Sequence, residues 1–537
     1  MKRAISIALL FLVLQSGAQS YWVFLVDKPN YRQGVNLENV DFLSQRSMER
    51  RQKQGIDLDP TDWPVDADYI NSIIGMGYEV VGVSRWLNAA IVRKSDQELD
   101  ALKSLPFVKE VKEVRRMKAL PKEEPSYAYT EKMSFSQSEY GDAGNQIHML
   151  HGEDLHNQGF RGEGMVIAVL DAGFTNANNL PVFQNMFAEG RFLGGWDFVN
   201  DNDSIFGHHP HGTYVLSCMT AELPGVMIGT APKASYWLIR TEDAATEQLV
   251  EEYYWLLGAE FADSVGADII NSSLGYTEFD GGTGSHTYAD MNGTTTIVSQ
   301  AANTAADKGI LVVNSVGNYG QATWRYLNAP SDAQGVLAIG GVNADSEYAS
   351  FSSHGPSADG RIKPNVSAQA EGTFVAATTG GTFSGNGTSF SSPIVAGMAA
   401  CLWQSRKEVS NWDIMFAIQK SAHQVSRPDS LLGYGIPNFA LAHEIFDEEI
   451  LNLDFPEINL FPIPARRELN VLLNERPKNS ISIAVYSSNG SVVYADEIPS
   501  QFFFTIPFSP AWAQGTYILE MRLDENVIRE RFLIQRP

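Results

Sequence analysis

The chain has 537 residues, of which 44% are hydrophobic, and a formal net charge of −24 at pH 7. This length predicts about two to four domains with ample core-forming material. The acidic balance argues against nucleic acid and against an anionic membrane surface as partners. The two cysteines, Cys218 and Cys401, exclude a disulfide scaffold. We expect two buried thiols in helices, with a single disulfide as the alternative.

The N-terminus has the three parts of a secretory signal peptide. A short basic start, Met1 to Arg3, precedes an apolar stretch from Ala4 to Leu14, and small residues follow at Ser16 to Ala18. This pattern predicts a signal peptide over residues 1–18. A membrane helix needs about 20 apolar residues, so this run is too short to span a bilayer. No other segment approaches that length, and we therefore expect an exported protein without a transmembrane helix.

Residues 19–118 read as a small α/β unit. Its predicted helices and strands alternate, with strands over 21–26, 79–83, 89–92 and 108–114 and helices over 42–53, 65–76 and 96–105. The basic cluster Arg46, Arg50, Arg51 and Lys53 is interpreted as a solvated helix face. Residues 119–140 contain prolines and glutamates and are interpreted as a linker.

Residues 141–445 alternate apolar strands with helices. The strands are predicted over 165–170, 236–239, 269–271, 310–313 and 336–339, with helices over 247–265 and 295–308. This alternation predicts an α/β domain with a doubly wound parallel sheet, whose functional groups lie at the carboxyl ends of the strands. Residues 450–537 instead contain six short strands and the hairpin signal Ser488-Asn489-Gly490, which predicts an all-β sandwich.

Three polar residues fall where such a sheet would bring them together. Asp171 ends the first core strand, His211 begins a predicted helix, and Ser389 begins another. A serine hydroxyl needs a base to take its proton, and the base needs a carboxylate to fix its tautomer. Alternatively, His208, His209 and His211 could bind a metal, although no carboxylate or cysteine pattern supports this.

The motifs around these residues resemble those of subtilisin-like serine proteases (the S8 family). They are Val-Leu-Asp-Ala-Gly at Asp171, His-Gly-Thr-Tyr-Val at His211 and Gly-Thr-Ser-Phe-Ser-Ser-Pro at Ser389, in the chain order Asp, His, Ser. The resemblance covers residues 141–445. It implies a serine endopeptidase in which Ser389 attacks the peptide carbonyl, His211 transfers the proton and Asp171 orients His211.

The same resemblance implies the remaining site residues. Asn318, after Val313 to Gly317, would complete the oxyanion hole with the Ser389 backbone amide. The substrate-binding strand and the other wall of the primary specificity pocket would be formed by Ser273, Leu274, Gly275, Ser315, Val316 and Gly317. An extended peptide could pair with these backbones.

Two positions depart from the family pattern. Tyr214 replaces the usual second histidine, and Phe390-Ser391-Ser392 replaces Met-Ala-Ala after the serine. Both changes affect packing or specificity rather than the triad.

The resemblance implies no cofactor for catalysis. Calcium often stabilises such folds, but no acidic loop is specific enough to name ligands.

The flanking regions also resemble known families. Residues 19–118 resemble the inhibitory, chaperone-like propeptide, with two split β-α-β halves, and cleavage is expected within 119–140. The tail resembles the C-terminal sorting domains of type IX secretion substrates in Bacteroidetes, with Ile463 in place of the usual Asn between two prolines. A plain β-sandwich that binds substrate or a surface is the alternative for the tail.

The sequence therefore predicts a secreted or cell-surface serine endopeptidase made as a zymogen. Its expected partners are protein substrates, its own propeptide and the secretion machinery, and we expect a monomer. One alternative is a catalytically silent subtilisin-fold protein that binds a surface. Another acyl hydrolase, such as an esterase, is disfavoured because Ser389 lacks the Gly-x-Ser-x-Gly elbow.

Overall fold

The computed structural model describes most of the chain between residues 19 and 535. The described residues are 19–31, 40–94, 99–114, 139–282, 284–446, 458–461, 465, 468–473, 477, 479–499, 503–509, 511–524 and 526–535. The predicted signal peptide, nearly all of the predicted linker and Ile463 lie outside them. No helix among these residues is long and apolar enough to cross a membrane. The chain forms two compact units, one containing residues 59–118 with the N-terminal strand, the other containing 36–58 and most of the rest.

The first unit is a four-stranded antiparallel sheet with two helices. The strand order is β2-β3-β1-β4. Its elements are β1 (Gln19–Leu25), α2 (Ala67–Gly75), β2 (Glu79–Ser84), β3 (Ala89–Lys94), α3 (Leu99–Lys103) and β4 (Val108–Val114). Val23, Ile73, Val92 and Leu102 form part of its buried core. The two split β-α-β halves predicted from the sequence are confirmed.

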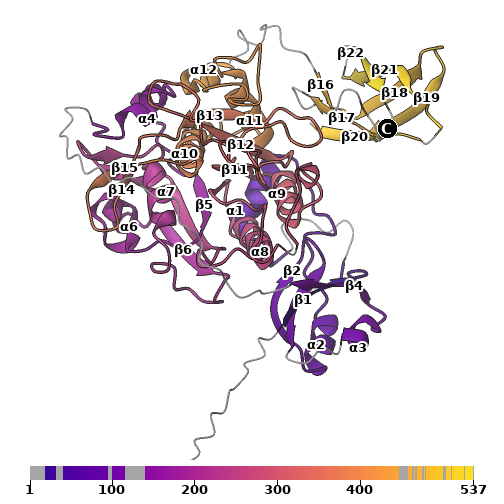
Figure 1. Cartoon of the computed structure of the whole chain (residues 1–537), viewed down its shortest axis with the longest axis horizontal. Helices are drawn as coiled ribbons and strands as arrows, with labels where there is room; N and C mark the ends of the chain where they lie inside the picture. Colours follow the sequence, from indigo (N-terminus) through magenta and orange to yellow (C-terminus); the bar gives the residue numbers. More distant parts are fainter. Residues whose placement is uncertain are drawn as a thin grey trace, which may run out of the picture. The chain divides into compact units, whose positions relative to one another are not determined.

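The second unit is built on a seven-stranded parallel sheet (Figure 1). Its order is β13-β12-β11-β10-β5-β9-β6. The strands are β5 (Val166–Asp171), β6 (Phe192–Asp197), β9 (Ser235–Arg240), β10 (Ile269–Ser272), β11 (Leu311–Ser315), β12 (Val336–Val342) and β13 (Val366–Gln369). The strands β6 and β13 were not predicted, because β6 contains two glycines and is half-exposed, while β13 has only four residues, two of them polar.

Helices cover both faces of this sheet. The bounds of the longer ones are α7 (His211–Thr220), α8 (Val250–Val265), α9 (Ile297–Asp307), α10 (Thr388–Ser405) and α11 (Asn411–Lys420), and the short ones are α4 (Gly144–His148), α5 (Gly152–Asn157), α6 (Gln184–Ala188) and α12 (Phe439–Glu444). Ile167 and Val169 of β5 share one buried cluster with residues of α7 and α10. Leu170 points to the other face, where Gly258 of α8 lies against it. This arrangement is the predicted doubly wound fold.

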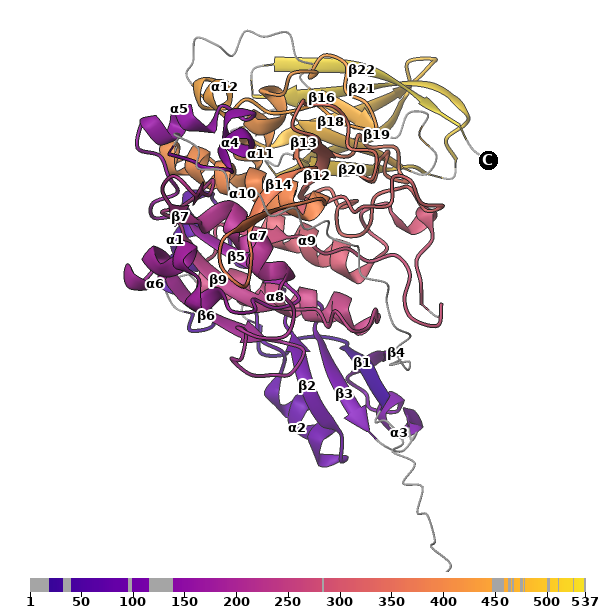
Figure 2. The same cartoon turned by 60° about the vertical axis from the view of Figure 1, so that its left-hand side comes forward.

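The tail forms two antiparallel sheets, drawn in orange to yellow in Figure 2. One has the order β16-β17-β20 and the other β19-β18-β21-β22. The strands are β16 (Ile458–Phe461), β17 (Glu468–Leu473), β18 (Ile481–Ser487), β19 (Val492–Ile498), β20 (Phe503–Pro507), β21 (Gly515–Leu523) and β22 (Asn526–Ile534). Val471 and Ile506 from the first sheet share a buried core with Val485 and Leu519 from the second. The predicted sandwich is confirmed.

The basic helix α1 (Gln45–Lys53) differs from its interpretation as a solvated face. It belongs to the second unit, and Arg50 and Arg51 are only 4% and 0% exposed. Both guanidinium groups contact Asp263, which lies 212 residues beyond Arg51 in the chain. The interpretation was wrong for these two arginines because the sequence does not show which distant acid a basic residue meets. Lys53 is exposed, as expected.

The expectation for the cysteines is confirmed. Cys218 lies in α7 and Cys401 in α10, and both are buried free thiols. Burial in an apolar setting raises the pKa of each thiol far above its ordinary value. Such thiols are poor nucleophiles, so we assign neither of them a chemical role.

Candidate active site

Asp171 is held at the carboxyl end of β5, where the sequence predicted it. Its side chain is completely buried, and its Oδ1 accepts a hydrogen bond from the backbone amide of Ala172 at 2.7 Å. The neighbouring strand β9 fixes the backbone, because the Thr241 amide donates to the Asp171 carbonyl at 3.0 Å. The carboxylate therefore has one orientation and faces the next polar group, His211.

His211 is the first residue of α7 and pairs with Asp171. Its Nδ1 lies 2.8 Å from Oδ1 and 3.0 Å from Oδ2 of that carboxylate. Burial acts to lower the pKa of His211, but the charge and hydrogen bond of Asp171 outweigh it and raise the pKa above the ordinary value. This contact places the Nδ1 proton toward Asp171 and leaves Nε2 available to exchange a proton with a substrate or a serine.

Two glycines explain why Asp171 and His211 can approach so closely. The Gly212 amide donates to the Gly173 carbonyl at 3.0 Å. A Cβ at Gly212 would lie 2.4 Å from that carbonyl oxygen and 2.8 Å from the ring of Phe174. Gly173, two residues after Asp171, and Gly212, directly after His211, therefore allow the start of α7 to pack on the end of β5.

Ser389 is the second residue of α10 and is half-buried. Its hydroxyl donates to the Ser273 carbonyl at 3.4 Å, and the Ser273 hydroxyl donates to the Ser389 carbonyl at 2.8 Å. The stacked rings of His211 and Phe390, 6.5 Å apart, place the next residue of α10 beside the histidine. Ser389 thus lies one residue from a ring that stacks on His211, with its own hydroxyl turned toward Ser273.

The side chain of Asn318 is held in place by Thr388, the residue before Ser389. Its Oδ1 accepts from the amide and the hydroxyl of Thr388, at 2.9 and 3.0 Å, which turns its Nδ2 the other way. A Cβ at Gly387 would lie 3.7 Å from this Nδ2 and 3.8 Å from the Ser389 amide nitrogen. Gly387 adopts φ 155° and ψ 141°, a backbone region close to glycine-only. Because it has no side chain, Gly387 leaves open the space between Asn318 Nδ2 and the Ser389 amide, the two proposed donors to the oxyanion.

The predicted substrate-binding residues form two segments next to Ser389. Ser273 to Gly275 follow β10, and Ser315 to Gly317 end and follow β11. The backbone of Val316 is already used within the fold, since its amide donates to Ile339 and its carbonyl accepts from Asn328. The Val316 amide is therefore not free to donate to a peptide, which leaves the segment Ser273 to Gly275, directly after β10, as the stronger candidate for pairing.

Asn328 lies between these two segments and was missed by the sequence analysis. A Cβ at Gly275 would lie 1.7 Å from its Nδ2, and a Cβ at Gly317 would lie 2.9 Å from the same atom. The side chain is 4% exposed, and the Ser331 hydroxyl lies 3.3 Å from its Oδ1. Its amide therefore occupies the gap between the two predicted pocket walls. The sequence around Asn328 carries no motif that could have revealed this.

Arg240 and Asp197 also support the site without a sequence signal. Arg240, at the end of β9, donates from Nε to the Ala172 carbonyl at 3.0 Å, next to Asp171. Its Nη1 contacts both carboxylate oxygens of Asp197, at 3.2 and 2.9 Å. Both side chains are almost fully buried, and they hold the backbone that carries Asp171.

The two departures from the family motifs are packing residues. Tyr214 is buried and meets Phe383 edge to face at 5.0 Å. Phe390 is also buried, and the Ser392 hydroxyl bonds to Asn271 at 3.0 Å. None of these groups competes with the candidate triad.

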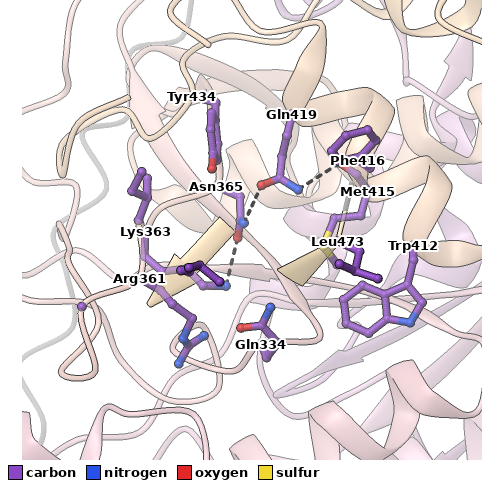
Figure 3. A pocket seen from close by; sticks show the side chains of 13 residues that line it. Gln334, Arg361, Lys363, Asn365, Trp412, Met415, Phe416, Gln419, Tyr434 and Leu473 are labelled. Atoms are coloured by element: carbon purple, nitrogen blue, oxygen red, sulfur yellow. Dashed lines mark hydrogen bonds between the residues drawn. The ribbon is translucent and has the colours of Figure 1, made fainter. Parts of the chain in front are cut away.

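A separate pocket in the second unit contains none of the predicted site residues (Figure 3). There the Lys363 ammonium donates to Asn365 at 2.9 Å, and Asn365 donates to Gln419 at 3.0 Å. Lys363 also donates to two backbone carbonyls, so its polar atoms are satisfied within the protein. This pocket therefore gives no reason to place the chemistry away from Asp171, His211 and Ser389.

Comparison with known families accounts for three parts of the chain. The Subtilase family (Peptidase S8) matches residues 162–435, about half of the chain. The Peptidase S8 propeptide domain of Bacteroidota matches residues 20–129. The Secretion system C-terminal sorting domain matches residues 459–535.

Two curated relatives, both proteases, agree with this assignment. Subtilisin E of Bacillus subtilis is 29% identical over 307 residues, covering 56% of this chain and 71% of its own. A thermostable alkaline protease of Halalkalibacterium halodurans is 29% identical over 293 residues, covering 54% of this chain and 70% of its own. A solved structure, "Structure of Prenylagaramide maturation protease PagA", aligns with a TM-score of 0.43 and 23% identity over 55% of this chain and 97% of that chain. The chain belongs to the subtilase family of serine peptidases and carries a propeptide domain and a type IX sorting domain.

Proposed function

We propose that this subtilase is a secreted zymogen whose mature form hydrolyses peptide bonds through Asp171, His211 and Ser389. The observation that carries the proposal is the 2.8 Å contact between His211 Nδ1 and Asp171 beside the helix that bears Ser389. The proposed mechanism requires the Ser389 hydroxyl to rotate away from Ser273 and donate to Nε2 of His211, the nitrogen that Asp171 does not use.

The reaction follows from these positions in two halves. Ser389 Oγ attacks the peptide carbonyl carbon while its proton passes to His211 Nε2, and Asp171 stabilises the imidazolium. The carbonyl oxygen becomes an oxyanion that accepts hydrogen bonds from Asn318 Nδ2 and the Ser389 amide. Loss of one such donor costs about 10²–10³ in kcat.

The intermediate then breaks down to products. The C–N bond breaks as the amine leaves with the proton from His211, and an acyl-enzyme on Ser389 remains. Water, with its proton taken by His211, attacks this ester, and the second tetrahedral intermediate releases the new carboxylate and the Ser389 hydroxyl. We propose that these steps need no cofactor. We assign no ligands for a structural calcium ion.

Asn328 supports a specific preference at the residue that precedes the cleaved bond. Its amide lies between Gly275 and Gly317, so it shortens the pocket between the two proposed walls. A large aromatic side chain would collide with it. A small side chain, or one that ends in an oxygen that accepts a hydrogen bond from Nδ2, would fit. We propose that the mature enzyme prefers substrates with such a residue directly before the cleaved bond.

We propose that the domains on either side of the peptidase domain control its export and its activation. Residues 19–118 act as the propeptide that inhibits the peptidase domain, 141–445, until cleavage within 119–140. Residues 450–537 direct the protein across the outer membrane to the surface or the medium, after the signal peptide, 1–18, has led it through the inner membrane. We propose that the mature peptidase is a monomer.

The proposal is tested with a fluorophosphonate probe that labels activated serines. The processed secreted protein is compared with its Ser389→Ala variant and with the unprocessed precursor. We expect labelling of the processed wild-type protein alone, because only there are the triad assembled and the propeptide released. Correctly processed protein that takes no label would contradict the proposal, and the silent surface-binding alternative would replace it.

A further inference from the structure

Helix α1 lies outside the sheet of the propeptide. It lies in sequence between β1 and α2, inside the span that matches the propeptide domain, residues 20–129. The four-stranded sheet β2-β3-β1-β4 with α2 and α3 is complete without it. Residues 36–58, which contain α1, group instead with the peptidase domain (Figure 1). One segment of the propeptide is therefore part of the peptidase fold.

Two arginines of α1 surround one buried carboxylate of the peptidase domain. Arg51 Nη2 donates to both oxygens of Asp263, at 3.0 and 2.8 Å, and Arg50 Nη2 donates to the same group at 2.5 Å. Arg50 Nη1 also donates to the Ala267 carbonyl at 2.6 Å. The side chains of Arg50, Arg51 and Asp263 are 3%, 0% and 0% exposed. Groups this buried are costly to separate, because each charge would lose its partner.

Further contacts continue along both ends of the helix. Arg46 pairs with Asp268 and donates to the carbonyls of Gly164 and Gly266, both at 2.9 Å. At the other end, Gln54 donates from Nε2 to the Gly309 carbonyl at 2.8 Å, and its Oε1 accepts from the Asn411 amide at 3.1 Å.

The peptidase backbone is shaped to receive this helix. A Cβ at Gly266 would lie 2.7 Å from the Ser47 backbone nitrogen, and a Cβ at Gly309 would lie 2.8 Å from the Gln54 amide. Both glycines have positive φ, 83° and 87°. Both positions are therefore glycines where a side chain would collide with α1 or its C-cap residue, as a site shaped to receive the helix requires.

The docking site lies at the end of the sheet opposite the proposed active site. Ala267 and Asp268 directly precede β10, and Gly309 precedes β11. The proposed substrate-binding residues follow the carboxyl ends of these same two strands. Because the strands are parallel, α1 contacts their amino ends and cannot block the substrate. The helix thus stabilises the sheet rather than inhibiting the enzyme.

We propose that the α1 segment, residues 40–58, stays bound to the peptidase domain after the rest of the propeptide has been removed. The mature enzyme then consists of two chains, with an arginine-bearing helix held by Asp263, Asp268 and the surrounding carbonyls. This requires hydrolysis of two further peptide bonds, one between β1 and α1 and one between α1 and α2, and water adds across each bond as in the established activity. The proposal rests on the maturation step of the proposed function.

Mass spectrometry of the processed secreted enzyme tests this directly. Under non-denaturing conditions we expect the mass of the peptidase plus a fragment that contains Arg46 to Gln54, and under denaturing conditions two separate chains. Active enzyme without this fragment would overturn the inference while leaving the peptidase assignment intact. Retention of the fragment with no fluorophosphonate labelling would contradict the proposed function instead.

Variants of α1 test whether the buried pairs cause the retention. The double variant Arg50→Gln/Arg51→Gln should lose the fragment during purification and shorten the thermal half-life of the active enzyme by about tenfold or more. Lys53→Gln, on an exposed position of the same helix, is the matched control and should keep both. Equal half-lives and equal fragment retention in the double variant and the control would overturn the role of Asp263.

Discussion

At the scale of single residues, hydrogen bonds within the protein hold the side chains of Asp171 and Asn318 in one orientation. Asp171 is buried and its carboxylate is shared between the Ala172 amide and His211. Asn318 is fixed in the same way, because Thr388 occupies its Oδ1 and leaves Nδ2 as a donor. Catalysis by such a site requires little rearrangement once a substrate has bound, which is the main physical advantage of preorganised polar groups.

The first prediction concerns the acidic limb of the pH–rate profile. His211 must be neutral to act as a base, and Asp171 raises the pKa of His211 above about 6.5, its ordinary value. The limb of kcat/KM should therefore lie above that pH. In Asp171→Asn the pKa should fall and the limb should move to lower pH, while kcat drops by about 10⁴. An unmoved limb in the variant would show that Asp171 does not set the pKa of His211.

The same pair gives a stability effect whose sign follows from the raised pKa. Protonated His211 is favoured in the folded protein, so the contribution is complete below about pH 6.5 and disappears as pH rises through the raised pKa. Thermal unfolding of Ser389→Ala, which avoids self-digestion, should report this trend. Adding Asp171→Asn should reduce it.

The second prediction concerns Asn328 and the size of the specificity pocket. Asn328→Gly removes the amide that lies between Gly275 and Gly317, so it should deepen the gap between them. We expect kcat/KM for substrates with a large aromatic residue before the cleaved bond to rise by about tenfold or more relative to those with a small one. Measurement on a matched set of peptide substrates checks this. An unchanged ratio would mean that the amide does not form the base of the pocket.

At the scale of elements, catalytic residues are carried by the first turns of helices packed on strand ends. His211 begins α7 and Ser389 lies in the first turn of α10, and these two helices pack on the same face of the sheet as Ile167 and Val169. The apolar packing of these helices fixes the distance between the polar groups at their N-termini. The relative position of the triad is thus decided by the core and not by the loops around it.

The third prediction tests the contact between α7 and β5. Gly212→Ala places a methyl group 2.4 Å from the Gly173 carbonyl oxygen, so α7 must move away from Asp171. We expect a loss of about 1–3 kcal/mol in the free energy of unfolding, measured in denaturant, and a large loss of kcat. Gly207→Ala is the control, because a Cβ there meets nothing within 4 Å. Similar losses in the two variants would refute the argument from close packing.

At the scale of the whole molecule, each folding unit has its own core and its own task. The propeptide sheet, the peptidase domain and the tail sandwich have separate buried clusters. Separate cores allow one part to be removed or replaced without unfolding the others. Helix α1 is the exception, since its sequence belongs to the propeptide span and its contacts to the peptidase domain.

The fourth prediction concerns the tail. Deletion of residues 450–537 removes the sorting domain together with its own sandwich core and leaves the peptidase core intact. The truncated protein should fold and accumulate in the periplasm, while the full-length protein reaches the medium or the cell surface. Cell fractionation with an antibody against the peptidase domain would measure this. Normal export of the truncated protein would contradict a sorting role and favour an accessory binding domain.

The sequence by itself determined the order of the domains, the type of each sheet and the identity of the triad candidates. These features depend on local patterns: the apolar strand that ends in Asp171, the His-Gly-Thr motif at His211 and the Gly-Thr-Ser motif at Ser389. The weakly amphipathic strands β6 and β13 were missed because glycines or polar residues interrupt them. Local patterns predict a feature well when a short stretch of sequence, such as one strand or one turn, is enough to determine it.

Only the tertiary structure decided which distant residues meet. The amide of Asn328 lies between two glycines from separate segments, and Arg50 and Arg51 meet Asp263 more than 200 residues later. No local pattern carries such information, because a side chain's burial and its partner depend on how the strands and helices pack. The basic helix α1, which was predicted to face solvent, therefore buries Arg50 and Arg51 in the peptidase domain, while Lys53 stays exposed.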